Sequence, residues 1–258
     1  MEVRHESRPH RLIFRKPFSE VSEKGFFFID PPHNAPKSGL KILEIGISTY
    51  SPQLAVSSKP TTMIILLDNG HGSDTPGKQS PDGFFREYAY NRFLASGIHE
   101  RLIALGLDSR FLVPEREDIP LPERCRRANA FCEQFGSDQV ILLSLHVNAA
   151  GNGQQWMKAR GWSCYTTRGE TKADALATCL YEAAKNHLPG MRLRTDYTDG
   201  DPDQEENFYI LRYSRCPAVL TENLFMDNRQ DVAFLESEEG ARAIVNLHVD
   251  GILLYMSK

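Results

Sequence analysis

The sequence predicts an α/β fold: a single three-layer domain with a central, mostly parallel sheet flanked by helices, preceded by an irregular N-terminal extension. Two observations lead to this prediction. From Met63 onward, short apolar segments rich in β-branched residues alternate with longer segments of helical periodicity. The short segments are also continuously apolar, which is typical of strands buried on both faces of a parallel sheet. Together these patterns indicate a sheet with helices on both faces.

The first half of the predicted domain begins with the strand Met63–Asp68, an apolar run bounded by turn residues. It is followed by Gly70-His71-Gly72, where we expect the glycines to let the backbone turn tightly around the histidine. Asp82-Gly83 can cap a helix whose apolar residues recur at near-helical spacing as far as Gly106. A short strand, a helix that ends at a glycine and an apolar strand that ends in histidine come next: Ser109–Val113, Leu121–Phe135 and Gln139–His146.

The second half of the predicted domain continues the alternation. Arg160–Thr167 is predicted to be a strand, and Thr171–His187 a helix that a Pro-Gly pair ends. Residues 189–206 are polar, and we expect a loop there. Pro217–Glu222 is the last predicted strand and ends in a carboxylate. An apolar stripe at helical spacing predicts a final helix over Glu238–Met256.

Residues 1–62 differ from the rest of the chain in composition. They carry scattered charges and a Ser/Pro/Thr-rich stretch from Ser48 to Thr62, without sustained helical or strand periodicity. We therefore expect residues 1–62 to be an N-terminal extension or linker that is poorly ordered. Residues 63–258 are expected to form the folded domain that carries the chemistry.

The composition limits the classes of function. The 258 residues have a formal net charge of -4 at pH 7 and no block of lysine and arginine, so we expect no nucleic acid or anionic membrane as a partner. No apolar run approaches the roughly 20 residues that span a bilayer, and the charged N-terminus lacks the apolar core of a secretory signal. The five cysteines include no CxxC pair, and we expect them to be small buried residues.

Four polar residues stand where a ligand site is expected. His71, His146 and Glu222 lie at the ends of apolar strands, and Glu87 falls in the first turn of the helix after the His71 loop. Open α/β sheets place their ligand sites at the carboxyl ends of the strands. Two histidines and one carboxylate suit a catalytic zinc that keeps one position open. Glu222, on a different strand, is then placed to accept a proton from a metal-bound water and return it to a leaving amine.

Each of these residues, taken alone, also has an explanation without function. A histidine after a strand is commonly a hydrogen-bonded loop residue, Glu87 suits an exposed carboxylate at a helix N-terminus, and Glu222 suits a structural salt bridge. The matching contexts of His71 and His146 favour a joint site. The HExxH signature of helix-based zinc proteases is absent from the sequence.

Four segments that follow one another along the chain carry these residues: Leu67–Gly72, Arg86-Glu87 with Asn91, Ser144–Ala149 and Pro217–Asn228. Together they resemble the motifs of zinc-dependent N-acetylmuramoyl-L-alanine amidases, the type 3 cell-wall amidase family, over nearly all of residues 63–258. The resemblance implies zinc at the positions of His71, Glu87 and His146, with Glu222 in the place of the catalytic glutamate. It also makes Asn148 and Arg212 candidate substrate-binding residues that line the site.

The resemblance implies hydrolysis of the amide that joins the lactyl group of N-acetylmuramic acid to L-alanine, so the expected partner is peptidoglycan or a muropeptide. Two other classes stay open: a zinc peptidase that acts on another stem-peptide amide, and a non-catalytic wall-binding or regulatory module on the same fold. Because no signal peptide is visible, we expect synthesis in the cytoplasm and action at the cell wall or periplasm after release or export, as for a phage lysin. The sequence leaves the oligomeric state open.

Overall fold

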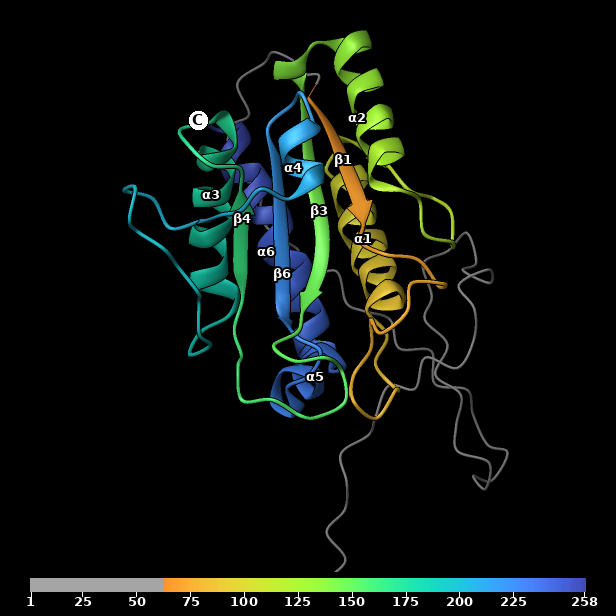
Figure 1. Cartoon of the computed structure of the whole chain (residues 1–258). Coiled ribbons are helices and arrows are strands. Elements are labelled where there is room, and N and C mark those ends of the chain that lie inside the picture. Colours follow the sequence, from red (N-terminus) through yellow and green to blue (C-terminus); the bar gives the residue numbers. More distant parts are fainter. Residues whose placement is uncertain (1–62) are drawn as a thin grey trace, which may run out of the picture. The chain divides into compact units, whose positions relative to one another are not determined.

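The computed structural model describes residues 63–258 (Figure 1). The predicted extension, residues 1–62, lies outside the described residues. Six strands form one sheet in the order β2-β1-β3-β6-β4-β5. Neighbouring strands are parallel except for β4 and β6, which are antiparallel, so the predicted mostly parallel sheet is confirmed. The strands are β1 Ile64–Asn69, β2 Asp108–Phe111, β3 Val140–Asn148, β4 Ser163–Thr166, β5 Gln204–Glu205 and β6 Ala218–Phe225.

Helices cover both faces of this sheet, which confirms the predicted three-layer domain (Figure 1). Helices α1, α3 and α6 share the larger hydrophobic cluster with one face of the sheet. Helices α2 and α4 share the smaller cluster with the other face. The helices are α1 Glu87–Ala104, α2 Leu121–Phe135, α3 Lys172–His187, α4 Tyr209–Tyr213, α5 Arg229–Leu235 and α6 Glu238–Met256, and a short 3₁₀ helix, Ser137–Gln139, precedes β3.

Alternate residues of the central strands enter the two cores, because successive side chains of a strand point to opposite faces. On β3, Leu143 and Leu145 belong to the cluster of α1, α3 and α6. Leu142 belongs to the cluster of α2 and α4. His146 has the same parity as Leu142 and therefore faces the α2 side of the sheet. Both faces of β3 are thus used, one for the larger core and the other for the smaller core and the site.

Helix α1 begins later than the sequence predicted. The side chain of Asp82 accepts a hydrogen bond of 2.6 Å from Ser80 Oγ in a local turn, so it does not cap the helix. Gln79 and Arg86 form an isolated antiparallel bridge, which keeps the chain extended up to Arg86. The first helical residue is therefore Glu87, and this start places the Glu87 carboxylate at the end of the helix that faces the loop after β1.

The last strand is longer than predicted. β6 continues to Phe225, so Glu222 lies within the strand and not at its end. His146 likewise lies inside β3, which continues to Asn148. Four elements were not predicted at all, namely β5, α4, α5 and the 3₁₀ helix, because segments of two to seven residues are too short to show a period.

All five cysteines lie in the described domain, and all are buried free thiols, as expected from the sequence. Within residues 63–258, every helix falls short of the length and apolar character that crossing a bilayer requires.

Candidate active site

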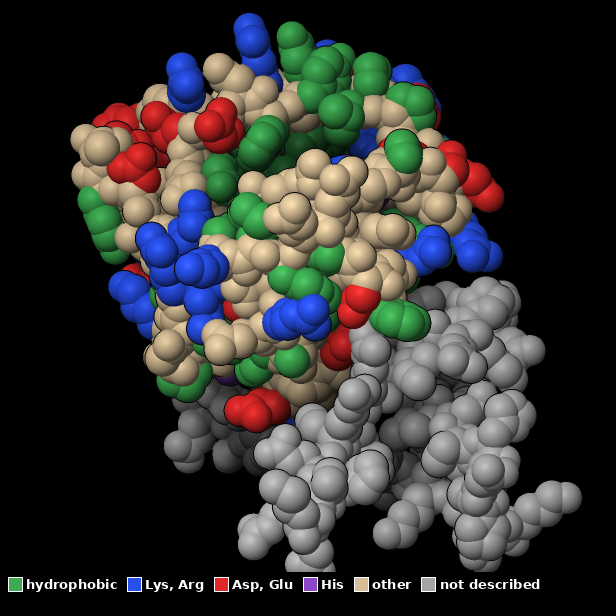
Figure 2. Space-filling model, turned by 60° about the horizontal axis from the view of Figure 1, so that its bottom comes forward, with side chains coloured by type: hydrophobic (Ala, Val, Ile, Leu, Met, Phe, Trp, Pro, Cys, Tyr) green, Lys and Arg blue, Asp and Glu red, His purple; other side chains and the backbone are tan. Residues whose placement is uncertain are grey.

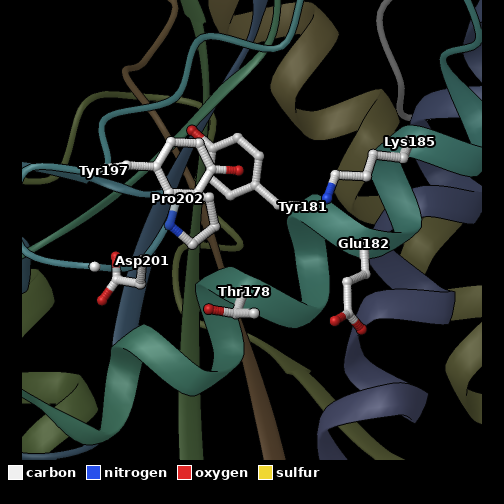
Figure 3. Close-up of a pocket in the computed structure, with 8 residues that line it drawn as sticks. Thr178, Tyr181, Glu182, Lys185, Tyr197, Asp201 and Pro202 are labelled. Atoms are coloured by element: carbon white, nitrogen blue, oxygen red, sulfur yellow. The ribbon is translucent and has the colours of Figure 1, made fainter.

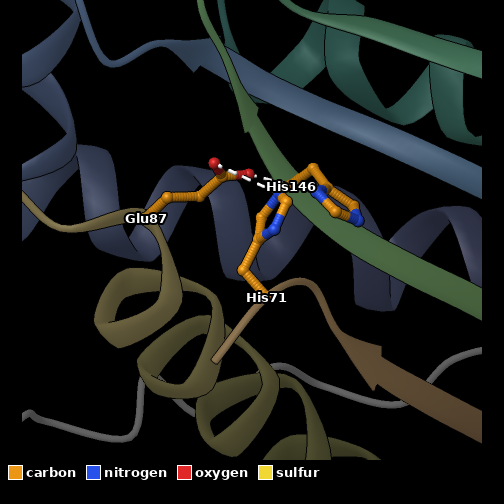
Figure 4. A group of neighbouring side chains, drawn as sticks. All are labelled: His71, Glu87 and His146. Carbon is orange, nitrogen blue, oxygen red and sulfur yellow. Dashed lines mark hydrogen bonds and ion pairs between the residues drawn. The ribbon is translucent and has the colours of Figure 1, made fainter. Parts of the chain in front are cut away.

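His71, Glu87 and His146 come together from three elements. His71 lies in the loop after β1, Glu87 is the first residue of α1, and His146 lies near the carboxyl end of β3. One ligand atom from each side chain lies within 4.8 Å of the other two (Figure 4). Two imidazole nitrogens and a carboxylate oxygen at this spacing can bind one metal ion. The fold therefore assembles the three residues that the sequence singled out as metal ligands.

The Glu87 carboxylate is buried, with 1% of its surface exposed, and only one of its oxygens is satisfied. Oε1 lies 3.1 Å from Nδ1 of His146 and accepts a hydrogen bond of 3.0 Å from the backbone nitrogen of Val147. Oε2 lies 3.5 Å from Nε2 of His71 but has no hydrogen-bond partner within the described domain. Because buried polar atoms are rarely unpaired, this oxygen fits a cation held between the three side chains.

The protonation of two of the three side chains, His71 and Glu87, also suits a cation. Burial lowers the pKa of His71 to about 4, against the opposing charge of Glu87. Burial would raise the pKa of Glu87, but the hydrogen bond and charge of His146 outweigh burial and leave that pKa lowered. Burial would lower the pKa of His146, but the hydrogen bond and charge of Glu87 leave it raised. A neutral His71 and an ionised Glu87 are the forms that bind a metal.

The backbone at His71 is strained and held by its neighbours. His71 has a φ of 62°, a left-handed conformation that costs a non-glycine residue about 1–2 kcal/mol. The Arg92 guanidinium donates to the His71 carbonyl at 3.0 Å, and Asn91 Nδ2 donates to the Gly70 carbonyl at 3.1 Å. Both donors lie on α1, so the helix that carries Glu87 also holds the His71 loop. Strain that is stabilised in this way is typical of functional sites.

Gly70 and Gly72 let the chain turn tightly around His71, as expected, but through the space that a missing Cβ leaves and not through a left-handed backbone. Neither glycine has a positive φ, and His71 between them makes the left-handed turn. A Cβ added to Gly70 would lie 2.3 Å from Cε1 of His146, and a Cβ added to Gly72 would lie 1.9 Å from the backbone nitrogen of Asp118. Glycine at position 70 therefore allows the end of β1 to lie directly against the ring of His146.

Glu222 lies beside the triad, because it pairs in register with His146 across β6 and β3. Leu220 contributes to the cluster of α2 and α4, so alternation turns Glu222 to the same face as His146. Oε2 of Glu222 is buried and has no hydrogen-bond partner among residues 63–258. Burial raises the pKa of Glu222 to about 8; the charge of Glu87 adds to this rise, and the charges of His146 and Lys78 oppose it.

Thr221 and Asn223 anchor β6 on the opposite face of the sheet. Asn223 Nδ2 donates to the carbonyl oxygen of His146 at 3.0 Å, and Trp162 Nε1 donates to Asn223 Oδ1 at 2.9 Å. Thr221 Oγ1 lies 2.9 Å from Nε2 of His248 on α6. These bonds connect the backbone of His146, a candidate metal ligand, to the larger core, and the sequence did not predict them.

A buried ion pair between Arg124 and Asp68, also not predicted, supports the end of β1. Arg124 Nη1 lies 2.6 Å from Asp68 Oδ1, with both side chains 2% exposed, and donates to the carbonyl of Asn69 at 2.7 Å. Ser144 Oγ donates to Asp68 Oδ2 at 2.6 Å. The sequence signal that could have indicated this pair was a carboxylate at the end of a buried strand, which requires a partner.

The two predicted substrate-binding residues lie in different places. Asn148 is half-buried at the carboxyl end of β3, two residues beyond His146. Arg212 is exposed on α4, and its guanidinium carbon lies 5.5 Å from the ring centre of Tyr213. α4 precedes the N-terminal end of β6, whereas Glu222 lies in the second half of that strand (Figure 1). The fold therefore brings Asn148 but not Arg212 to the end of the sheet with the triad, and substrate binding by either residue stays a prediction.

Two surface hollows of about 310 Å³ each lie apart from the predicted site residues. One lies beside α3, where Tyr181, Tyr197 and Pro202 gather (Figure 3). The other lies between the loop that follows β3 and the start of α5, and Trp156 and Arg229 contribute to its wall. On the face that Figure 2 shows, Lys and Arg side chains lie in small groups separated by acidic and uncharged side chains.

Comparison with known proteins places this geometry in a family. The family model described as N-acetylmuramoyl-L-alanine amidase (Amidase_3) matches residues 65–253. The endolysin of Bacillus phage SPP1 is 26% identical over 205 residues, which cover 73% of this chain and 64% of the endolysin. The N-acetylmuramoyl-L-alanine amidase CwlM of Bacillus licheniformis is 27% identical over 190 residues, which cover 73% of this chain and 66% of CwlM. The matched region is thus less than two-thirds of the length of either relative.

Solved structures share the fold. The catalytic domain of CwlV, an N-acetylmuramoyl-L-alanine amidase from Bacillus (Paenibacillus) polymyxa var. colistinus, aligns with a TM-score of 0.63 and 21% identity, covering 76% of this chain and 98% of that domain. The N-acetylmuramoyl-L-alanine amidase from Clostridium difficile 630 aligns with a TM-score of 0.62 and 23% identity. The alignment covers 76% of this chain and 97% of that amidase. Because the family model spans most of the chain and includes His71, Glu87, His146 and Glu222, the chain belongs to the N-acetylmuramoyl-L-alanine amidase family.

Proposed function

We propose that the chain is a peptidoglycan hydrolase that cleaves the amide between the lactyl group of N-acetylmuramic acid and L-alanine. The observation that carries this proposal is the joint placement of three metal-binding side chains and a buried carboxylate. The ligand atoms of the triad lie within 4.8 Å of one another, and Glu222 pairs in register with His146. Family membership supports the choice of the bond, and the amidase and endolysin names of the relatives agree with it.

We assign a zinc ion to His71, Glu87 and His146. Two imidazole nitrogens and one carboxylate oxygen form a common ligand set for a hydrolytic zinc site with an open position. The unpaired Oε2 of Glu87 and the lowered pKa of His71 support this assignment. Zinc bound there would make a water ligand more acidic and polarise the carbonyl of the scissile amide.

Glu222 is assigned the proton transfers. The proton acceptor is the ionised carboxylate, the form that a cation held by the triad would favour against the effect of burial. It accepts a proton from the attacking water and then donates that proton to the leaving nitrogen of alanine, so that the amine departs neutral. The position on the same face as His146 and the free Oε2 support this role. The hydrogen bond from Asn223 to the His146 carbonyl keeps the two strands in register at this point. General acid–base catalysis of this kind contributes about 10²- to 10⁴-fold to a rate.

The test is to incubate the purified, zinc-loaded protein with defined muropeptides and to identify the products by mass spectrometry. The proposal expects N-acetylmuramic acid with a free lactyl carboxylate and a stem peptide that begins with L-alanine. Cleavage at another amide would identify a stem-peptide peptidase instead. Muropeptide binding without any cleavage would identify a wall-binding or regulatory module.

We also propose that the protein acts at the cell wall or in the periplasm after release or export, because its proposed substrate lies there. Fractionation of producing cells, with immunodetection in the cytoplasmic and wall fractions before and during lysis, tests this. Wall turnover without any of the protein leaving the cytoplasm would contradict it.

A further inference from the structure

A row of side chains crosses the sheet beside the triad. His146 on β3 pairs with Glu222 on β6, and Glu222 pairs in turn with Ser163 on β4. Adjacent strands lie about 4.8 Å apart, so each step of this row moves the same distance away from the proposed metal. The row therefore leads from the proposed reaction centre toward the side of the sheet formed by β4 and β5.

The row continues beyond β4 to Arg194. Trp162 forms an isolated parallel bridge with Leu193, and the backbone nitrogen of Arg194 donates to the Trp162 carbonyl at 2.8 Å. This register places Arg194 next to Ser163. Two strand spacings, roughly 10 Å, thus separate the backbones of Arg194 and Glu222.

Ser163 and Arg194 point to the same face as Glu222. Trp162 and Cys164, on either side of Ser163, belong to the cluster of α1, α3 and α6, and Leu193 packs against that cluster. Because side chains alternate along an extended chain, Ser163 and Arg194 point toward the opposite face. The whole row therefore shares one face of the sheet.

Two outer members of the row, Glu222 and Arg194, each carry a buried polar atom without a hydrogen-bond partner in the described part of the chain. These atoms are Oε2 of Glu222 and Nε of Arg194. Buried polar atoms are paired in the great majority of cases. Two unpaired atoms in one row indicate that a polar ligand lies along it.

Arg194 is suited to bind an anion. Its guanidinium carbon lies 5.3 Å from the ring centre of Phe225, which pairs with Asn148 across β6 and β3. Within residues 63–258, the buried Nε of Arg194 has no hydrogen-bond partner, a carboxylate included. Arginine stays charged in proteins, and its planar donors bind a carboxylate in bidentate fashion. A cation that rests on an aromatic ring, with this nitrogen unpaired in the described domain, is therefore open to an anionic ligand.

We propose that Arg194 binds a carboxylate of the stem peptide and selects substrates in which that group is free. This inference rests on the proposed amidase function. We place the scissile amide at Glu222. The separation of roughly 10 Å between the backbones of Glu222 and Arg194 then corresponds to two or three residues of an extended peptide at about 3.3 Å per residue. Allowing for the reach of the arginine side chain toward Glu222, the recognised carboxylate belongs to the residue that follows alanine.

The test compares two synthetic muropeptides that differ only at the residue after L-alanine, which carries either a free α-carboxylate or the corresponding carboxamide. Wild-type protein is compared with Arg194→Gln and with the matched control Arg192→Gln, whose exposed side chain lies two positions away. The backbone oxygen of Arg194 accepts hydrogen bonds from Tyr181 and Gln204, and the Arg194→Gln substitution retains this backbone. Thermal unfolding of all three proteins verifies that they are folded.

We expect Arg194→Gln to lower kcat/KM for the free carboxylate by about 10- to 100-fold, as for the loss of a charge-assisted hydrogen-bonded pair. For the carboxamide substrate, kcat/KM of Arg194→Gln should change by less than about 3-fold. Arg192→Gln should match the wild type on both substrates. Equal losses on both substrates, or no preference by the wild type, would overturn the role of Arg194 while leaving the amidase function intact. If the wild type cleaves neither muropeptide, both proposals are wrong.

Discussion

His146 and Glu222 lie directly opposite each other on the two central strands of the sheet, β3 and β6, with their side chains on the same face. One of these residues belongs to a triad whose ligand atoms lie within 4.8 Å of one another, and the other has a buried oxygen without a hydrogen-bond partner among residues 63–258. The register of a single strand pair thus sets the distance between the proposed metal and the proposed acid–base group. Metal binding and proton transfer are thus assigned to different residues, and mutation can distinguish them.

The substitution Glu222→Gln should abolish proton transfer and leave metal binding intact. We expect turnover to fall by at least about 100-fold, since a positioned acid–base group contributes about 10²- to 10⁴-fold, while the zinc content measured by atomic emission stays near one ion per chain. His71→Ala is the contrasting variant, because it removes a ligand and should lose both zinc and turnover. Near-normal hydrolysis by Glu222→Gln would rule out its assigned role.

Gly70→Ala should damage the metal site without unfolding the domain. The added Cβ would lie 2.3 Å from Cε1 of His146, so the ring must move. Changing a residue that orients a metal ligand typically costs about 10- to 100-fold in metal affinity. Zinc affinity is measured by competition with a chromogenic chelator. Gly77→Ala is the control, because a Cβ there meets nothing within 4 Å and adds only backbone strain at a φ of 75°. Equal zinc affinities of the two variants would contradict the steric explanation.

Arg124→Met should destabilise the domain strongly. Both Arg124 and Asp68 are 2% exposed in their 2.6 Å ion pair, and removing one partner of a buried pair typically costs about 3–5 kcal/mol, because it leaves the other charge buried. Arg126→Met on the same helix is the control, since Arg126 is 68% exposed and such pairs contribute about 0–1 kcal/mol. Urea unfolding monitored by circular dichroism gives the free energy of unfolding of each variant relative to the wild type. If Arg124→Met loses no more unfolding free energy than Arg126→Met, then water or another side chain compensates the charge of Asp68.

His248 should make the domain sensitive to mild acid. Burial lowers the pKa of His248 from 6.5 to about 4, and its ring lies between Thr221 Oγ1 and the carbonyl of Ile244. The unfolded chain therefore binds a proton more readily than the folded one. Stability from this group is retained above pH 6.5 and is lost progressively as the pH falls from 6.5 toward 4.

When the pH falls from 7 to 5, the free energy of unfolding of the wild type should decrease by about 2 kcal/mol more than that of a variant without a titratable group at position 248. His248→Gln is that variant, and both proteins are unfolded in urea with a chelator present, so that metal binding at the triad does not contribute. Parallel loss of stability in the two proteins would show that other groups cause the acid sensitivity.

Much of the fold followed from local pattern. Continuous apolar runs predicted β1 and β3, and helical periodicity placed α2 at Leu121–Phe135 and α6 at Glu238–Met256, the bounds that the structure has. The start of α1 was wrong because Gln79 and Arg86 pair across a bridge, a contact that no local pattern records. The strand β6 was predicted to end at Glu222, which is too early, because Asn223 is a polar residue whose partner, Trp162, lies far away in the chain.

The sequence by itself determined the chemistry of this protein: two histidines and two glutamates, each beside an apolar run or at a helix start, in an order that resembles one family. Local propensity and motif spacing suffice for this, because strand and helix signals depend on neighbouring residues. Only the tertiary structure decided which groups meet. Strand register placed Glu222 against His146, steric contact with a distant ring explained Gly70, and a bridge beyond β4 brought Arg194 into the same row. These relationships arise from packing between segments far apart in the chain, and a linear pattern carries no information about them.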